Sequence, residues 1–271
     1  MQTGISTASL FLRKNNEKAL PLLNELGVKT AEIFLTSFSE YGEPFASELL
    51  KNKGDIAINS VHILNTQFEP QLFNAHPRVR ADAYYWLDKV MQSAKILGAP
   101  YYTFHGTARI KRASRSGVND NFTAMTDGFR TIIDKCESYG VKLCLENVEW
   151  ATYNRVGVFE RLKKELPTLL GVLDIKQARI SDEPYEKYLT EMGERLAYVH
   201  VSDCDKDGKM CLPGKGEFDF DTLVKRLKDV GFDGALIIEA YTNDYDKETE
   251  LADSLAFLNE KLYKYNCLSK K

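Results

Sequence analysis

The sequence lacks the features that define several large classes of protein. No stretch approaches the roughly 18 uninterrupted apolar residues of a membrane-spanning helix. Residues 1–18 contain no basic segment followed by a long apolar core, so we expect no secretory signal peptide. The 36 basic and 39 acidic residues are well mixed, with a net charge of −3 and no long basic stripe. We therefore expect a cytoplasmic protein that binds neither membranes nor nucleic acid.

Cysteine is scarce, and its spacing argues against two further classes. The five cysteines are odd in number and form no Cys-x-x-Cys pair, unlike a disulfide framework or a zinc ribbon. Cys204 and Cys211 flank a predicted loop, where a bond between them or a shared metal is the alternative to the reduced thiols that we expect. No linker, low-complexity tract or break in composition divides the chain, so residues 1–271 are predicted to form one domain.

Eight short apolar segments recur along the chain, and most are followed by a helical pattern. Their composition is rich in β-branched, aromatic and leucine residues without strict alternation, which is typical of strands buried on both faces in a parallel sheet. The segments cover residues 4–10, 30–35, 57–63, 101–106, 142–148, 170–175, 196–202 and 235–241.

Helices are predicted over residues 16–27, 80–98, 123–140 and 220–231, each ending in a glycine that suits a helix C-terminus. Alternation of eight strands with helices in a chain of this length predicts an α/β protein, a (β/α)8 TIM barrel, whose typical size is about 250 residues. A doubly wound open sheet is the main alternative. It would ordinarily carry a glycine-rich phosphate loop after its first strand, and "ISTASLFLRKN" has none.

Six successive predicted strands end in a side chain that can bind a metal or transfer a proton. In a barrel of this kind, active sites form where the strands end and the following loops begin. Carboxylates are rarely buried without partners, yet those here directly follow apolar residues in "LCLE", "GVLD" and "LIIE". The fourth histidine of the chain, His76, lies before a predicted helix and is expected to be structural. The six side chains belong to His62, His105, Glu146, Asp174, His200 and Glu239.

The last four of these residues form a plausible ligand set for one divalent cation. Clustered carboxylates repel one another, and a cation is the simplest way to neutralise them. Carboxylate oxygens with one imidazole suit Mn²⁺, Mg²⁺ or Co²⁺ in an open site, with Zn²⁺ as a further candidate. A purely structural ionic network inside the barrel is the alternative. With a metal to polarise a ketose carbonyl, Glu146 and Glu239 could approach opposite faces of one carbon, one removing a proton and the other returning it.

The motifs "LEN", "VLDIKQA", "VHVSD…LPGKGEFDF" and "IIEAY" resemble those of the xylose-isomerase-like barrel superfamily over essentially the whole chain. This superfamily contains sugar isomerases and epimerases together with an endonuclease IV branch. The resemblance implies that Glu146, Asp174, His200 and Glu239 are the metal ligands and that the two glutamates are the acid/base pair. It also implies a small sugar-like substrate, such as a ketose or an inosose, and a homodimer or homotetramer.

The chain departs from the family pattern where the substrate is expected. Many members have a histidine three residues after the strand-six aspartate, where this chain has Gln177 preceded by Lys176. Gln can hydrogen-bond a hydroxyl but is a weaker metal ligand. After strand seven, lysines stand in place of an arginine. The residues predicted to contact the substrate are His62, His105, Trp150, Lys176, Gln177 and Lys215. Phe38 and Phe68 are alternatives for an apolar wall, and the basic stretch 106–117 is either a solvated loop or a lid.

Three other functions remain open from the sequence. A dehydratase or lyase would use the same metal site. An endonuclease IV-like enzyme would use His62 and His105 as zinc ligands, but it also needs histidines after strands six and seven, which this sequence lacks. A barrel that binds a sugar without catalysis is the third alternative.

Overall fold

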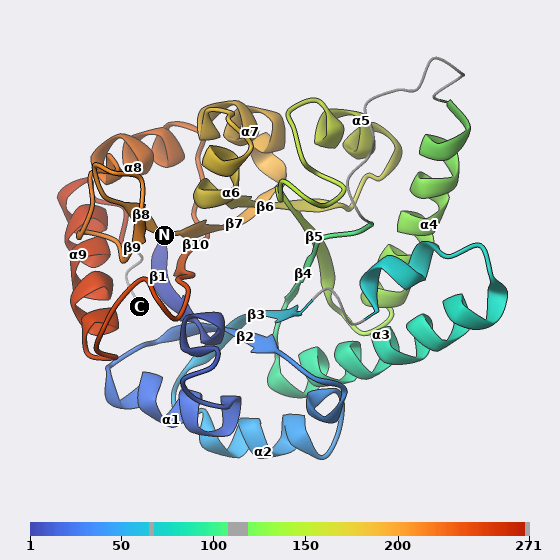
Figure 1. Ribbon diagram of the computed structural model, residues 1–271, viewed down its shortest axis with the longest axis horizontal. Coiled ribbons are helices and arrows are strands. Elements are labelled where there is room, and N and C mark those ends of the chain that lie inside the picture. Colours follow the sequence, from blue (N-terminus) through green and yellow to red (C-terminus); the bar gives the residue numbers. More distant parts are fainter. Residues whose placement is uncertain (65–67, 108–118, 269–271) are drawn as a thin grey trace.

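The computed structural model describes residues 1–64, 68–107 and 119–268, the side chains of 119–121 excepted, and its central strands close into a parallel barrel (Figure 1). Around the barrel the order is β1-β10-β7-β6-β5-β4-β3-β2. The strands are β1 (Gln2–Ser6), β2 (Thr30–Leu35), β3 (Ala57–Ile63), β4 (Tyr101–Phe104), β5 (Lys142–Glu146), β6 (Leu170–Asp174), β7 (Leu196–Val201) and β10 (Ala235–Ile238). The predicted TIM barrel is confirmed.

Helices surround the barrel on its outside, as Figure 1 shows. They are α1 (Asn16–Glu25), α2 (Phe45–Asn52), α3 (Pro77–Leu97), α4 (Asn119–Glu137), α5 (Val158–Glu165), α6 (Ile175–Ile180), α7 (Tyr185–Met192), α8 (Phe220–Asp229) and α9 (Glu250–Lys264). Short 3₁₀ helices are η1 (Thr7–Leu10), η2 (Phe38–Glu40), η3 (Glu69–Phe73) and η4 (Gly193–Arg195), and a small hairpin joins β8 (Asp203–Cys204) to β9 (Met210–Cys211).

The helix predictions were correct in position and off by a few residues at their ends. Gly98 ends α3 with a left-handed backbone (φ 71°), which glycine adopts without a Cβ penalty. The helix begins at Pro77, three residues before the predicted start, because proline at the first position is already preorganised for helix. His76 is the exposed residue that precedes the helix.

Six of the eight predicted strands proved too long at their carboxyl ends, by one to four residues. The first strand stops at Ser6, whose hydroxyl accepts from Ala8 N at 3.2 Å and begins the 3₁₀ helix η1. Strands β4 and β10 stop at Phe104 and Ile238. His105 and Glu239 therefore lie one residue beyond their strands, at the rim of the barrel.

Alternation of side chains along the strands decides what lies inside the barrel. Because successive residues point to opposite faces, positions two apart share a face. A compact apolar cluster of Cys144, Val172, Ala197, Tyr198, Ala235 and Ile237 is separate from the main core between strands and helices. Four of these residues precede Glu146, Asp174, His200 and Glu239 by two positions. The apolar layer inside the barrel is thus the floor beneath those polar side chains.

Asp203 organises the loop that carries the "PGKGEFDF" motif. Its buried carboxylate accepts backbone N–H groups from Cys204, Gly214, Gly216 and Phe218 at 2.7 to 3.1 Å. A Cβ on Gly216 would lie 2.2 Å from Cys204 O, so only glycine permits this approach. In the adjoining hairpin Cys204 pairs with Met210, and both Cys204 and Cys211 are free thiols, as expected.

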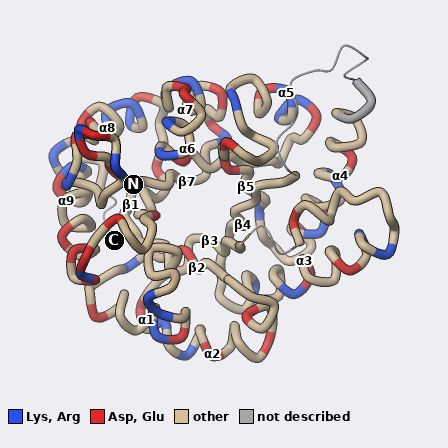
Figure 2. The backbone as a smooth tube through the Cα atoms, viewed as in Figure 1, with Lys and Arg blue, Asp and Glu red and all other residues tan. Residues whose placement is uncertain are grey.

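Charges of both signs are interspersed over the surrounding helices (Figure 2). Among the described residues, none of the helices combines the length and the apolar character needed to cross a bilayer.

Candidate active site

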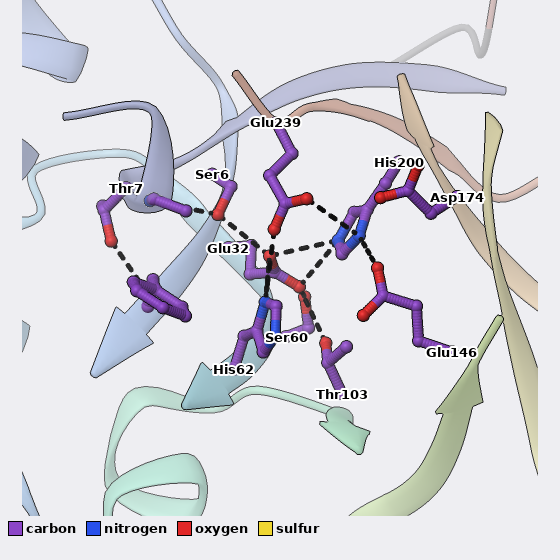
Figure 3. Close-up of polar contacts among 12 residues, drawn as sticks. Ser6, Thr7, Glu32, Ser60, His62, Thr103, Glu146, Asp174, His200 and Glu239 are labelled. Carbon is purple, nitrogen blue, oxygen red and sulfur yellow. Dashed lines mark hydrogen bonds and ion pairs between the residues drawn. The ribbon is translucent and has the colours of Figure 1, made fainter. Parts of the chain in front are cut away.

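The mouth of the barrel brings all six predicted strand-end residues together. Figure 3 labels five of them, all but His105. One ligand atom from each of Glu146, Asp174, His200 and Glu239 lies within 4.8 Å of the others, and all four residues are buried. These side chains come from the ends of β5, β6, β7 and β10. The structure therefore assembles the predicted ligand set in one place.

His200 lies between two groups of carboxylates. Its Nδ1 is 2.8 Å from Glu146 Oε1 and 3.8 Å from Glu239 Oε2. Its Nε2 is 3.1 Å from Glu32 Oε1, on the opposite side of the ring. Burial by itself lowers the pKa of His200, but the charges of Glu32, Glu239 and Glu146 outweigh it and hold the pKa well above the usual range. Nδ1 is thus the atom that faces the ligand cluster, and Nε2 is the atom that Glu32 holds.

Asp174 presents a buried oxygen without a hydrogen-bond donor. Its Oδ1 accepts from Gln177 N at 2.9 Å and caps α6, whereas Oδ2 has no hydrogen-bond partner. Asn147 aligns this residue through its side-chain amide, which donates to Asp174 O and accepts from Asp174 N. Burial raises the pKa of Asp174 to about 7; Lys176 opposes the rise, and the charges of Glu146 and Glu239 add to it. An oxygen without a hydrogen-bond donor beside two other carboxylates fits a site for a divalent cation.

Glu32, on β2, is a polar residue of the site that the sequence did not predict. Its fully buried carboxylate accepts from six side chains, those of Ser6, Ser60, His62, Thr103, Tyr198 and His200, at 2.8 to 3.3 Å. Burial raises its pKa, but the charges and hydrogen bonds of His200 and His62 outweigh this and hold the pKa well below the usual range. The available signal was a carboxylate inside the otherwise apolar strand "TAEIFL".

A pair of histidines extends the cluster on one side. The Nε2 atoms of His62 and His105 are 3.0 Å apart, and His105 Nε2 is 3.2 Å from Glu146 Oε2. Behind His105, Glu69 accepts from Nδ1 at 3.0 Å and from Tyr102 OH at 2.7 Å. The two Nε2 atoms can share only one proton, so the pair carries fewer protons than two separate imidazolium rings. Glu69 lies on η3, and no sequence signal pointed to it.

Some of the predicted substrate contacts lie at the cluster and one lies away from it. Gln177 and Lys176 are buried at the start of α6, and Lys176 Nζ lies 3.2 Å from Glu239 Oε2. Trp150 is 43% exposed and its ring lies 5.2 Å from that of His105, which places an aromatic surface beside the cluster. Lys215 is exposed in the loop held by Asp203, and within the described part of the chain no contact joins it to the cluster.

The two aromatic alternatives pack among neighbouring rings. Phe38 lies 4.4 Å from the ring of Trp86, and Phe68 lies 5.9 Å from that of Tyr41. Instead, Phe34 packs its ring edge-on against His62, with ring centroids 5.0 Å apart. Most of the basic stretch 106–117 lies outside the described residues.

Metal binding at this site should strengthen as the pH rises. A cation must displace the proton from His200 Nδ1 and any proton on Asp174. Raised pKa values mean that both groups still hold protons near neutral pH in the metal-free protein, so protons compete most at low pH. We expect the Kd for Mn²⁺ to fall about tenfold per pH unit for each proton displaced, as measured by calorimetry between about pH 6 and about pH 8. A Kd that does not change over this interval would contradict the ligand assignment.

Comparison with known proteins agrees with the fold. A family model described as "Xylose isomerase-like TIM barrel" matches residues 20–261, and the chain belongs to that family. An uncharacterized protein of Methanocaldococcus jannaschii is 28% identical over 54% of this chain and 52% of its own length. A ketose 3-epimerase of Arthrobacter globiformis is 26% identical over 41% of this chain and 39% of its own. The matches thus span about half or less of these relatives.

Solved structures match over almost the whole chain. D-Psicose 3-epimerase of Clostridium cellulolyticum H10, solved with D-tagatose, has a TM-score of 0.78 at 17% identity and covers 97% of this chain and 99% of its own. The IOLI protein with a bound zinc atom has a TM-score of 0.75 at 17% identity, covering 97% of each chain. At such identities the likeness establishes the shared barrel fold.

Proposed function

We propose that this protein is a divalent-metal-dependent sugar isomerase or epimerase that acts on a small ketose, an inosose or a related hydroxy-ketone. Glu146, Asp174, His200 and Glu239 would hold the metal. The proposal includes a cytoplasmic location, a small-molecule partner, and assembly as a homodimer or homotetramer. The ketose 3-epimerase and D-psicose 3-epimerase to which the chain is similar support a sugar as the substrate.

One observation carries the proposal: two glutamates converge on one buried site from different strands, together with an aspartate oxygen that has no donor. A divalent cation bound there would polarise a substrate carbonyl and lower the pKa of the neighbouring C–H. Glu146 and Glu239 then serve as the base that takes the proton and the acid that returns it. Each requires its carboxylate to face the substrate carbon, which their position at the rim of the barrel allows.

The remaining polar groups would orient the substrate. Gln177 can hydrogen-bond a hydroxyl, and the partly exposed face of Trp150 can stack on an apolar face of a sugar. The His62–His105 pair lies next to Glu146 and can donate or accept at a second hydroxyl. Lys176 and Lys215 complete the proposed substrate contacts.

Metal content and hydrogen exchange test this function together. Mass spectrometry of the purified protein should find about one Mn, Mg, Co or Zn per chain, lost in His200→Ala and retained in His76→Ala, which removes an exposed histidine outside the site. The metal-loaded protein should then incorporate deuterium from D₂O into a ketose or inosose at the carbon next to the carbonyl. If the protein holds no metal even after reconstitution, the proposed mechanism is wrong.

Metal content and deuterium exchange also distinguish the alternative functions. The endonuclease IV-like function is favoured by one specific observation: His62, His105 and Glu146 also form a group of potential metal ligands. About three zinc ions per chain and cleavage of abasic DNA would establish that function. With a dehydratase, deuterium would enter the product and the substrate would lose water. A barrel that binds a sugar without catalysis would cause no hydrogen exchange in that sugar.

A further inference from the structure

Lys176 brings a buried positive charge into the cluster of carboxylates. Its side chain is 2% exposed, and Nζ lies 3.2 Å from Glu239 Oε2 and 3.7 Å from Asp174 Oδ2. The ammonium also lies over the ring of Tyr241, 4.1 Å from its centroid. A buried ammonium is costly unless it is paired, and its two partners here are proposed metal ligands.

The position of Lys176 in the fold keeps this charge at the site. It is the second residue of α6, two residues after Asp174, whose carboxylate caps the same helix. The whole residue is 3% exposed, so the ammonium is largely shielded from solvent. A cation held by Asp174 and Glu239 would therefore share their oxygens with an ammonium group close by.

Lys176 acts on the proposed ligands differently with and without a metal. Without the metal, Lys176 stabilises two carboxylates that would otherwise repel each other. With the metal, the ammonium and the dication repel each other in a site shielded from water, where such interactions are strong.

We propose that Lys176 is an internal counter-cation that competes with the divalent ion for Asp174 and Glu239 and so weakens metal binding. The inference rests on the metal site of the proposed function. Its consequence is a readily exchangeable metal, whose occupancy follows the free metal concentration.

Calorimetric titration of the EDTA-treated full chain with Mn²⁺ alone, at one fixed pH, tests this proposal. Lys176→Met keeps an unbranched side chain of similar length without the charge, and Lys176→Arg keeps the charge. We expect Lys176→Met to bind Mn²⁺ at least about tenfold more tightly than the wild type, and Lys176→Arg to show no such gain. The rise in Tm on adding Mn²⁺ should be larger for Lys176→Met as well. If Lys176→Met folds poorly, Lys176→Gln provides the same comparison.

The outcomes separate this inference from the proposed function. If the wild type binds one Mn²⁺ and the neutral variants bind it equally or more weakly, the counter-cation role is wrong and the metal site stands. If only the neutral variants bind Mn²⁺, Lys176 takes the place of the metal in the wild type, which supports the competition and overturns the metal-dependent function. If no variant binds Mn²⁺, both are overturned.

Discussion

Glu239→Gln should strongly slow the interconversion of two epimers while one of them still exchanges its carbon-bound hydrogen with solvent. With two bases on opposite faces of the carbon, each glutamate removes the proton of one epimer only. Glutamine cannot accept that proton, so conversion should fall by about 10²- to 10⁴-fold in both directions. The remaining Glu146 can still remove and return the proton on its own face. NMR in D₂O would follow deuterium uptake in each epimer separately.

Glu146→Gln should give the opposite result, with hydrogen exchange confined to the other epimer. Glu191→Gln is the matched control, because this buried glutamate accepts from Tyr153 OH and from Gly157 N, away from the site. It should leave the exchange rate of the folded protein unchanged. Metal content must be measured in each variant, since both active-site glutamates are also proposed ligands. If the same epimer exchanges in both variants, the two-base assignment is wrong.

Removal of the Glu32 carboxylate should cause a large loss in the free energy of unfolding. Glu32→Ala leaves six buried donors without their shared acceptor, among them the rings of His62 and His200. Breaking a buried charge network in this way typically costs about 3–5 kcal/mol of the free energy of unfolding. Urea denaturation of the metal-free protein measures this loss. Glu25→Ala, at an exposed position of α1, should change stability by no more than about 0.5 kcal/mol.

The same substitution should weaken metal binding. Glu32 contacts His200 Nε2 and thereby turns Nδ1 toward Glu146, the arrangement in which a carboxylate orients a metal-binding histidine. We expect the Kd for Mn²⁺ to rise about 10- to 100-fold in Glu32→Ala. Glu32→Gln keeps an acceptor oxygen and should retain part of this affinity. An unchanged affinity in Glu32→Ala would mean that packing alone orients His200.

The barrel and the rim residues were predictable because both depend on local patterns. Apolar segments alternating with helices that end at glycines such as Gly98 predict the barrel from neighbouring residues alone. Once the strands are parallel in a closed barrel, their carboxyl ends meet at one rim. His62, Glu146 and His200 therefore had to lie near one another wherever the strands ended. Errors of two and three residues in the ends of β4 and β10 did not move His105 and Glu239 from the rim.

Strand direction alone thus determined which residues of this protein gather at the barrel mouth. Only the tertiary structure decided how their charges are balanced. Glu32 is separated from His200 by 168 positions, and Lys176 from Glu239 by 63, so no local pattern relates them. Hydrogen bonds act over about 3 Å, and the register and side-chain rotamers that bring such groups within reach are set by packing across the closed barrel.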